Sequence, residues 1–337
     1  MFFLLIAGVV SCSCLGTWLL RRYALARSII DVPNARSSHS VPTPRGGGVA
    51  IVVSYLALLP VLVALDAVSL PPALAIAGGG AGIAMLGFLD DHGHIAARWR
   101  LLGHFIAAAW VLFWLGGLPT LEILGLSVES GWVLNTLALF YIVWLLNLYN
   151  FMDGIDGIAS LEAITSCVMA CMIFWGLGYQ QLVAAPLFLA AAVVGFLVWN
   201  FPPAKIFMGD AGSGFLGIVL AVLSLQAAWI SPDLFWAWLV LLGVFIVDAT
   251  VTLIRRLMRG EKVYEAHRSH AYQFAARGIG RHLPVTLWVC AINIIWLAPV
   301  AWSVASGFID GVTGLVVAYM PLVFLAVKFR AGQAELT

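Results

Sequence analysis

The chain has 337 residues, of which 63% are hydrophobic and only 10% are charged, and its formal net charge is +1. A soluble domain is about half apolar and about a quarter charged. This composition excludes a soluble globular protein. It predicts an all-α, polytopic membrane protein, for which we expect no nucleic-acid partner.

Eleven apolar stretches are long enough to cross a bilayer, which takes about 20 mostly apolar residues. They cover residues 2–20, 47–65, 71–89, 101–117, 132–149, 159–178, 183–199, 212–229, 235–253, 285–305 and 311–328. No basic residue precedes the first stretch, so we expect a retained span rather than a cleaved leader. We expect residues 1–337 to form a single membrane domain.

All basic residues lie on one side of this predicted bundle. The 17 Lys and Arg residues fall in the connections that follow odd-numbered spans or in the C-terminal tail. The positive-inside rule makes that side cytoplasmic, which puts the N-terminus outside and the C-terminus inside. The cytoplasmic connections are then about 21–46, 90–100, 150–158, 200–211 and 254–284.

The first two of these connections carry charged residues next to spans. Arg45 precedes three glycines, and a guanidinium there could contact phosphate, although a glycine-rich turn alone is a weak signal. Asp90 and Asp91 end the third span, where adjacent acids oppose the helix dipole. Such conflicts are expected at functional sites. The simpler alternative is a solvated helix end in a salt bridge with Arg98 or Arg100.

The segment Asn147–Gly157 lies between the fifth and sixth spans and holds Asp153 and Asp156, each followed by glycine. In a helical turn, this three-residue spacing puts both acids on one face. There they would bind a metal ion, a basic side chain or a proton. Capping of the sixth span by Asp156 or Ser160 would explain one acid but not both.

The segment Phe207–Gly214 opens the eighth span, with Asp210 in a glycine-rich turn. The N–H groups of a helix start favour phosphate, and Mg²⁺ takes one or two carboxylates together with phosphate oxygens. A phosphate bridged by Mg²⁺ is therefore the predicted ligand. The alternative is that Asp210 only caps the helix.

Asp248 lies inside the ninth span, and an ionisable residue within a span is a functional-site hypothesis by default. The alternative is a structural pair with Arg255 or another basic residue. The next connection holds His267, Arg268 and His270, which could hold a diphosphate or serve as topology and lipid contacts. Together these motifs predict Mg²⁺-dependent chemistry on a phosphorylated, water-soluble donor beside a lipid acceptor.

In this order, over residues 30–275, the motifs resemble those of the polyprenyl-phosphate N-acetylhexosamine-1-phosphate transferases, which are of the glycosyltransferase family 4 type. The resemblance rests on the Asp90-Asp91 pair, Asn150-Phe-Met-Asp-Gly-Ile-Asp-Gly157, Asn200 with Pro203-Ala-Lys-Ile-Phe-Met-Gly-Asp-Ala-Gly-Ser213, and the acid of the ninth span followed by a basic loop. The combination of the two glycine-flanked motifs is specific.

The resemblance implies transfer of a sugar 1-phosphate from a UDP-N-acetylhexosamine to undecaprenyl phosphate, with release of UMP. It implies Mg²⁺ as the cofactor, with Mn²⁺ as a substitute. It also implies a multi-pass enzyme of the bacterial inner membrane with its active site on the cytoplasmic face. The partners would be these two substrates, membrane lipid and, in a homodimer, a second copy of the chain.

The resemblance and the basic residues above give each candidate a role. The catalytic carboxylates would be Asp90, Asp91, Asp153 and Asp156, the metal ligands Asp210 and Asp91, and the substrate-binding residues Asn150, Asn200, Phe207, Arg45, His267, Arg268 and His270. Asp90 would position the lipid phosphate or remove its proton. Asn150, Asp153 and Asp156 would serve the nucleotide, and Asn200 and Phe207 would hold and stack the uracil.

The loop after the ninth span departs from the family pattern. Many relatives carry His-x-His-His there, whereas this chain has His270-Ala-Tyr-Gln273. The muramoyl-pentapeptide branch carries three consecutive histidines, so the loop favours the O-antigen-initiating enzymes of lipopolysaccharide synthesis. Those enzymes use N-acetylated 6-deoxyhexoses or related sugars. Phospho-N-acetylmuramoyl-pentapeptide transfer in peptidoglycan synthesis stays as the alternative.

Three other classes fit less well. A membrane transporter would place its binding groups near the bilayer midplane, and Asp248 is the only feature in its favour. A CDP-alcohol phosphotransferase would have an Ala-Arg pair after the first Asp-Gly of its motif, which residues 153–160 lack. An inactive scaffold is not expected, because every matched acid is present.

Overall fold

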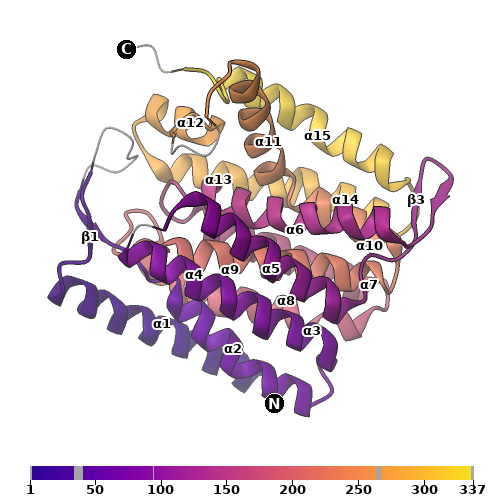
Figure 1. Cartoon of the computed structure of the whole chain (residues 1–337), viewed down its shortest axis with the longest axis horizontal. Coiled ribbons are helices and arrows are strands. Elements are labelled where there is room, and N and C mark those ends of the chain that lie inside the picture. The colour runs from indigo at the N-terminus through magenta and orange to yellow at the C-terminus, as the bar shows by residue number, and fades with distance from the viewer. Residues whose placement is uncertain (1, 34–40, 94, 263–266, 335–337) are drawn as a thin grey trace.

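The computed structural model describes residues 2–33, 41–93, 95–262 and 267–334 (Figure 1). The helices are α1 (Phe2–Ala26), α2 (Val49–Ala64), α3 (Leu70–Ala75), α4 (Ala81–His92), α5 (Ala97–Leu115), α6 (Trp132–Met152), α7 (Ile158–Gly176), α8 (Ala184–Asn200), α9 (Asp210–Ala228), α10 (Pro232–Leu241), α11 (Gly243–Met258), α12 (Ala271–Ile279), α13 (His282–Ile292), α14 (Ala298–Ala305) and α15 (Gly311–Lys328). Short antiparallel pairs join β1 (Ile30–Asp31) to β2 (Thr43–Pro44) and β3 (Leu121–Ile123) to β4 (Leu126–Val128). The all-α prediction is confirmed for the main body of the described chain.

Eight helical segments in the described residues are long and apolar enough to cross a membrane. They are Phe2–Ala26, Leu70–His92, Trp132–Met152, Ile158–Gly176, Gln180–Asn200, Asp210–Ala228, His282–Ala305 and Gly311–Lys328. The three other predicted spans fall on α2, which has 16 residues, on α5, and on the pair α10–α11. The chain is therefore a polytopic membrane protein, while the count of eleven spans and the orientation of the termini stay predictions.

The predicted ninth span, residues 235–253, is divided in the structure. It forms two helices, α10 and α11, that are bent by 70° relative to each other. Helix α11 buries Asp248, Thr252 and Arg256. Polar side chains at membrane depth face protein rather than lipid. The bend lets α11 present these side chains to neighbouring protein segments, α12 among them.

Helix α9 is the most deeply buried helix among the candidate spans. It is apolar on all sides, as expected for a helix surrounded by protein, and it packs against α4, α6 and α10. A Cβ added to Gly217 would lie only 2.7 Å from the Cα of Leu146 in α6. Such small residues let membrane helices approach closely. The packing fixes where the first residue of α9, Asp210, emerges.

Glycines also bring the polar segments together at one end of the bundle. A Cβ on Gly87 in α4 would lie 2.5 Å from the carbonyl carbon of Asp210, and one on Gly48 would lie 2.5 Å from the Cα of Gly212. The N–H of Gly48 donates to the carbonyl of Met208 (2.9 Å). The start of α2, the end of α4 and the start of α9 therefore meet in one place.

Candidate active site

Three carboxylates and two arginines form an ion cluster at this meeting point. Arg45 forms an ion pair with Asp91, and its guanidinium lies 3.6 Å from Oδ1 of Asp210. Arg100 pairs with Asp90 and lies 3.8 Å from Oδ2 of Asp210. The predicted salt bridge between Asp90 and Arg100 is thus present, but it belongs to a larger cluster and does not leave a solvated helix end.

Asp91 has an oxygen that nothing in the described chain satisfies. Its side chain is only 2% exposed. Oδ1 accepts the N–H of Asp210 (3.3 Å), which is the first residue of α9, whereas Oδ2 is buried and has no hydrogen-bond partner among the described residues. A buried carboxylate oxygen without a partner is costly. This oxygen is therefore suited to meet a cation or a donor group from a substrate.

Among the described residues, no three His, Cys, Asp or Glu side chains are grouped as ligands for one metal ion. Mg²⁺ commonly takes only one or two carboxylates from the protein and completes its shell with phosphates and water. Asp91 and Asp210 can supply such a pair, and the unpartnered Oδ2 of Asp91 fits this role. Metal binding at this position stays a prediction.

Asp153 follows the last residue of α6 and belongs to the same electrostatic environment. Burial, followed by the negative charges of Asp210 and Asp91, raises its pKa to about 7, while Arg45 acts in the opposite direction. Asp153 can therefore exchange a proton near neutral pH. The cluster holds more negative charge than its arginines can compensate, as expected where a cation or a proton is to be bound.

Asp156 does not share a helical face with Asp153, and that expectation is wrong. The chain between α6 and α7 is not helical, so the three-residue spacing does not align the two side chains. Oδ2 of Asp156 accepts the N–H of Ala204 (3.0 Å), and Oδ1 lies 3.2 Å from Nδ1 of His282. The N-cap of α7 is Gly157, without a side-chain cap, so neither predicted cap is formed.

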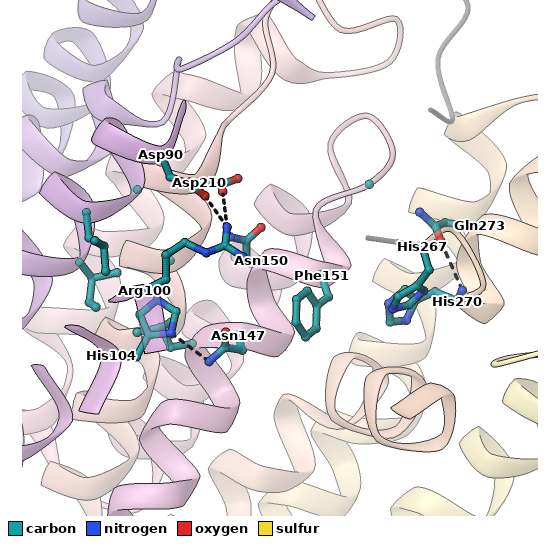
Figure 2. A pocket seen from close by; sticks show the side chains of 16 residues that line it. Asp90, Arg100, His104, Asn147, Asn150, Phe151, Asp210, His267, His270 and Gln273 are labelled. Atoms are coloured by element: carbon teal, nitrogen blue, oxygen red, sulfur yellow. Dashed lines mark hydrogen bonds and ion pairs between the residues drawn. The ribbon is translucent and has the colours of Figure 1, made fainter. Parts of the chain in front are cut away.

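A cavity of about 330 Å³ lies beside the ion cluster. Figure 2 shows Asp90, Arg100 and Asp210 on one side of it and His267 and His270 on the other. Asn150, Phe151 and Gln273 also line the cavity (Figure 2). The structure therefore brings together five predicted site residues and Arg100 from segments far apart in the sequence.

The sequence analysis missed His104 and Asn147 as residues of this cavity. Both line it, and Nδ2 of Asn147 lies 3.1 Å from Nδ1 of His104 (Figure 2). One signal was available: His104 follows Arg100 by four residues on a helix, which places both side chains on one face.

A second cavity, of about 430 Å³, is lined by Phe207 and Asp156 together with Thr43, Arg281 and His282. Arg45, two residues after Thr43, reaches the ion cluster of the first cavity. The two cavities are thus linked by the segment that carries Arg45. His282 is a further residue that the sequence analysis missed.

Asn200 is not among the residues that line either cavity. It is 3% exposed. Its Oδ1 accepts the N–H of Gly157 (3.0 Å), and its Nδ2 donates to the carbonyl of Ile206 (3.0 Å). Its amide connects the loop that carries Asp156 to the loop that carries Phe207. Asn200 therefore supports the wall of the second cavity without lining it.

The loop before α12 holds two stacked histidines. The rings of His267 and His270 are 4.8 Å apart, and both line the first cavity. Burial, followed by the neighbouring His270 ring and the positive charge of Arg256, lowers the pKa of His267 to about 3. Arg268 is not among the residues lining this cavity. Residues 264–266, which precede His267 in this loop, lie outside the described residues.

Asp248 does not pair with Arg255. Instead, Oδ1 of Asp248 lies 3.3 Å from Nδ1 of His270 and accepts the N–H of Ala271 (2.9 Å). Arg255 donates from Nη1 to the carbonyl of Ala331 (3.0 Å). The predicted partner Arg255 is therefore wrong, and the basic side chain that Asp248 contacts is a histidine of the cavity.

The fold and the site together define a class: a polytopic membrane protein with a charged pocket built from two acidic motifs and two arginines.

Comparison with known proteins gives the family. The sequence profile of Glycosyl transferase family 4 matches residues 73–228. The chain is also 30% identical over 329 residues to a protein of Bacillus subtilis named probable undecaprenyl-phosphate N-acetylglucosaminyl 1-phosphate transferase. That match covers 95% of this chain and 88% of the relative. The chain therefore belongs to glycosyl transferase family 4.

Two further relatives represent different branches. Decaprenyl-phosphate N-acetylglucosaminephosphotransferase of Mycobacterium tuberculosis is 30% identical, over 86% of this chain and 78% of its own length. Phospho-N-acetylmuramoyl-pentapeptide-transferase of Halalkalibacterium halodurans is 27% identical, over 83% of this chain and 89% of its own length. The family resemblance read from the motifs is thereby confirmed.

Proposed function

We propose that the protein transfers an N-acetylhexosamine 1-phosphate from a UDP-sugar to undecaprenyl phosphate and releases UMP. The observation that carries the proposal is the ion cluster of Asp90, Asp91 and Asp210 with Arg45 and Arg100 beside a cavity. The names of two relatives describe transfer of an N-acetylglucosamine phosphate to a polyprenyl phosphate, which is undecaprenyl phosphate for the Bacillus protein and decaprenyl phosphate for the Mycobacterium protein.

In the proposed reaction, an oxygen of the lipid phosphate attacks the phosphorus that carries the sugar. A new P–O–P bond to the lipid forms, and the bond between the two phosphates of the donor breaks, so that UMP leaves. We favour this direct attack over an aspartyl intermediate. Such transfers are accelerated mainly by positioning and by electrostatic stabilisation of the phosphates.

The arginines are suited to that task. A guanidinium binds phosphate oxygens through two parallel hydrogen bonds. Arg45 and Arg100 each contact one carboxylate closely and Asp210 more loosely. Each guanidinium can therefore give up its looser contact with Asp210 to bind a diphosphate, while its close contact with Asp91 or Asp90 is kept. Asp90, at the cavity wall, would orient the lipid phosphate or take its remaining proton.

We further propose that Asp91 and Asp210 hold Mg²⁺, with Mn²⁺ as a substitute. When bound, the ion would neutralise charge on the diphosphate. The protein side of this proposal is the unpartnered Oδ2 of Asp91 and the position of Asp210 at the start of α9. The positive end of the α9 helix dipole lies at the same place and would favour the diphosphate.

The second cavity is the proposed place for the uridine of the donor. Phe207 offers an aromatic ring and Asp156 a carboxylate that can accept an N–H from a base. Thr43 lines this cavity and lies two residues before Arg45 of the ion cluster, where the diphosphate would bind. Asn200 would contribute by holding the two loops together.

As the branch of the family, we propose initiation of an O-antigen in lipopolysaccharide synthesis at the cytoplasmic face of the bacterial inner membrane. Tyr272 and Gln273 stand where many relatives carry histidine. Here the Tyr272 hydroxyl donates to the carbonyl of Phe151 (3.0 Å), and Oε1 of Gln273 accepts the N–H of His270 (3.3 Å). Tyr272 thus connects the start of α12 to the end of α6, and Gln273 caps α12 while it also lines the cavity. Phospho-N-acetylmuramoyl-pentapeptide transfer is the second candidate, favoured by the Halalkalibacterium relative.

The test is UMP release by the purified protein in detergent with undecaprenyl phosphate and Mg²⁺. The donors would be UDP-N-acetylglucosamine, UDP-N-acetylgalactosamine, a UDP-N-acetylated 6-deoxyhexose and UDP-N-acetylmuramoyl-pentapeptide. Lipid-dependent release that stops on chelation of Mg²⁺ would support the proposal, and the preferred donor would choose the branch. A folded protein that releases no UMP from any of these donors would overturn it.

A further inference from the structure

Asp248 is a buried carboxylate on α11 whose oxygens are fully engaged. It is 6% exposed. Besides its contacts with His270 and Ala271, it accepts the N–H of Tyr272 (3.0 Å) and the hydroxyl of Thr252 (3.2 Å). It therefore fixes both the first residues of α12 and the ring of the histidine that precedes them.

The contact with Asp248 determines how the ring of His270 is protonated. An ionised carboxylate only accepts hydrogen bonds, so Nδ1 of His270 must be the donor in the 3.3 Å contact. In the neutral ring, Nε2 then carries the lone pair and acts as an acceptor. The hydrogen bond made by one ring nitrogen fixes the role of the other in this way.

Nε2 of His270 is left for a ligand. The residue is 2% exposed, and Nε2 is buried without a hydrogen-bond partner among the described residues. His270 also lines the cavity, across from Asp90, Arg100 and Asp210 (Figure 2). Buried polar atoms in native proteins are nearly always paired, so an acceptor in this position indicates a substrate group that donates.

We infer that Asp248 is a positioning residue that presents Nε2 of His270 to the sugar of the donor. The inference rests on the proposed function. Phosphate oxygens are acceptors and would be repelled by a lone pair, and Arg100, which suits them, lies on the opposite side of the cavity (Figure 2). The group that fits Nε2 is a hydroxyl or amide N–H, and an N-acetylhexosamine carries both.

The competing explanation is that Asp248 only caps α12, because a carboxylate that accepts the first N–H groups of a helix stabilises it. Two substitutions of His270 separate these roles. His270→Asn places an amide near Nδ1 and keeps a partner for Asp248, but it removes the group at Nε2. His270→Gln instead places an amide near Nε2.

The experiment measures kcat/KM for the preferred UDP-sugar in the wild type, the two His270 variants, Asp248→Asn and the double variant Asp248→Asn/His270→Asn. We expect His270→Asn and Asp248→Asn each to lower kcat/KM by about tenfold or more. His270→Gln should retain more activity than His270→Asn. The double variant should match His270→Asn alone, because residues that act through one another are not additive.

Two further measurements distinguish the positioning of His270 by Asp248 from a purely structural role of Asp248. The affinity for UMP, which lacks the sugar, should be unchanged in all variants, and Arg22→Lys, at a residue that lines neither cavity, should keep kcat/KM within about twofold. Full activity of His270→Asn, or additive losses in the double variant, would overturn the inference. A wild type that is inactive with every donor would instead overturn the proposed function.

Discussion

The guanidinium of Arg45 is paired with the carboxylate of Asp91, although the two residues lie 46 positions apart in the chain. Arg45 comes just before α2, and Asp91 lies near the end of α4. Their contact joins the start of α2 to the end of α4. Oδ2 of Asp91 has no partner in the described chain.

Asp90→Asn and Asp210→Asn should each abolish transfer and leave membrane insertion and folding intact. Each substitution removes a charge that orients an arginine beside the proposed phosphates. Losses of about 10²- to 10³-fold in kcat are typical when one electrostatic contact to a transition state is removed. Turnover of UDP-sugar and size-exclusion profiles would be measured together. Wild-type-like turnover in either variant would remove that residue from the mechanism.

Arg45→Lys should be almost as damaging as Arg45→Ala. Lysine keeps the charge but cannot form two parallel bonds to a phosphate or a carboxylate. We expect kcat to fall at least about tenfold for the lysine variant. Arg22→Lys is the matched control, because Arg22 contacts the ring of Trp18 outside the cluster. Equal activity of Arg45→Lys and wild type would show that only charge is needed.

The thermal stability of the wild type should fall as pH rises from about 4 to about 7. The folded state raises the pKa of Asp153 from 3.8 to about 7, chiefly by burial. In this window the unfolded chain has lost the proton that the folded chain retains, so the folded state loses stability as pH increases. Asp153→Asn should flatten the dependence of Tm on pH and raise Tm at pH 8. The melts would be run without Mg²⁺, and parallel curves would contradict the assignment.

The C-terminal segment should support the histidine loop. The N–H of Gly332 donates to the carbonyl of Ser269 (2.6 Å), and Ser269 lies between His267 and His270. Truncation after Arg330 removes this contact and should lower kcat/KM for the donor by several-fold, with little change in KM for undecaprenyl phosphate.

Truncation after residue 334 is the matched control for this effect, because it keeps every described contact of the segment. Gly332→Ala should give a partial loss. Gly332 has φ +71°, and a Cβ there would lie 2.8 Å from the Cβ of Arg255. Full activity after truncation at Arg330 would mean that the loop holds its position without the tail.

Exchange of residues 264–273 for those of a relative should alter sugar preference more than lipid preference. His267 and His270 line the cavity, and residues 264–266 lie outside the described residues. Relative kcat/KM values across the UDP-sugar panel would be compared with those for two polyprenyl phosphates of different length. An unchanged donor profile would refute the role of this loop in recognition.

The sequence by itself determined the helices and the chemical types at the site. Long apolar stretches satisfy their backbone hydrogen bonds only as helices in a membrane, so the predicted spans fall on helical segments, although the ninth is divided into α10 and α11. The acids Asp90, Asp91 and Asp210 each border a long apolar stretch, and together with the segments Asn150–Gly157 and Pro203–Ser213 they indicated the family. These features depend on residues that are near one another in sequence.

The tertiary structure alone decided which of these residues face the same cavity. Asp153 and Asp156 are three residues apart yet have different partners, because the chain between α6 and α7 is not helical and Asp156 is drawn to Ala204 and His282. Asn200 connects the loops that carry Asp156 and Phe207, and Asp248 contacts the ring of His270. Each outcome depends on packing between distant segments and on which buried polar atoms find partners there. Local spacing does not encode either of these, because both arise only when the helices come together.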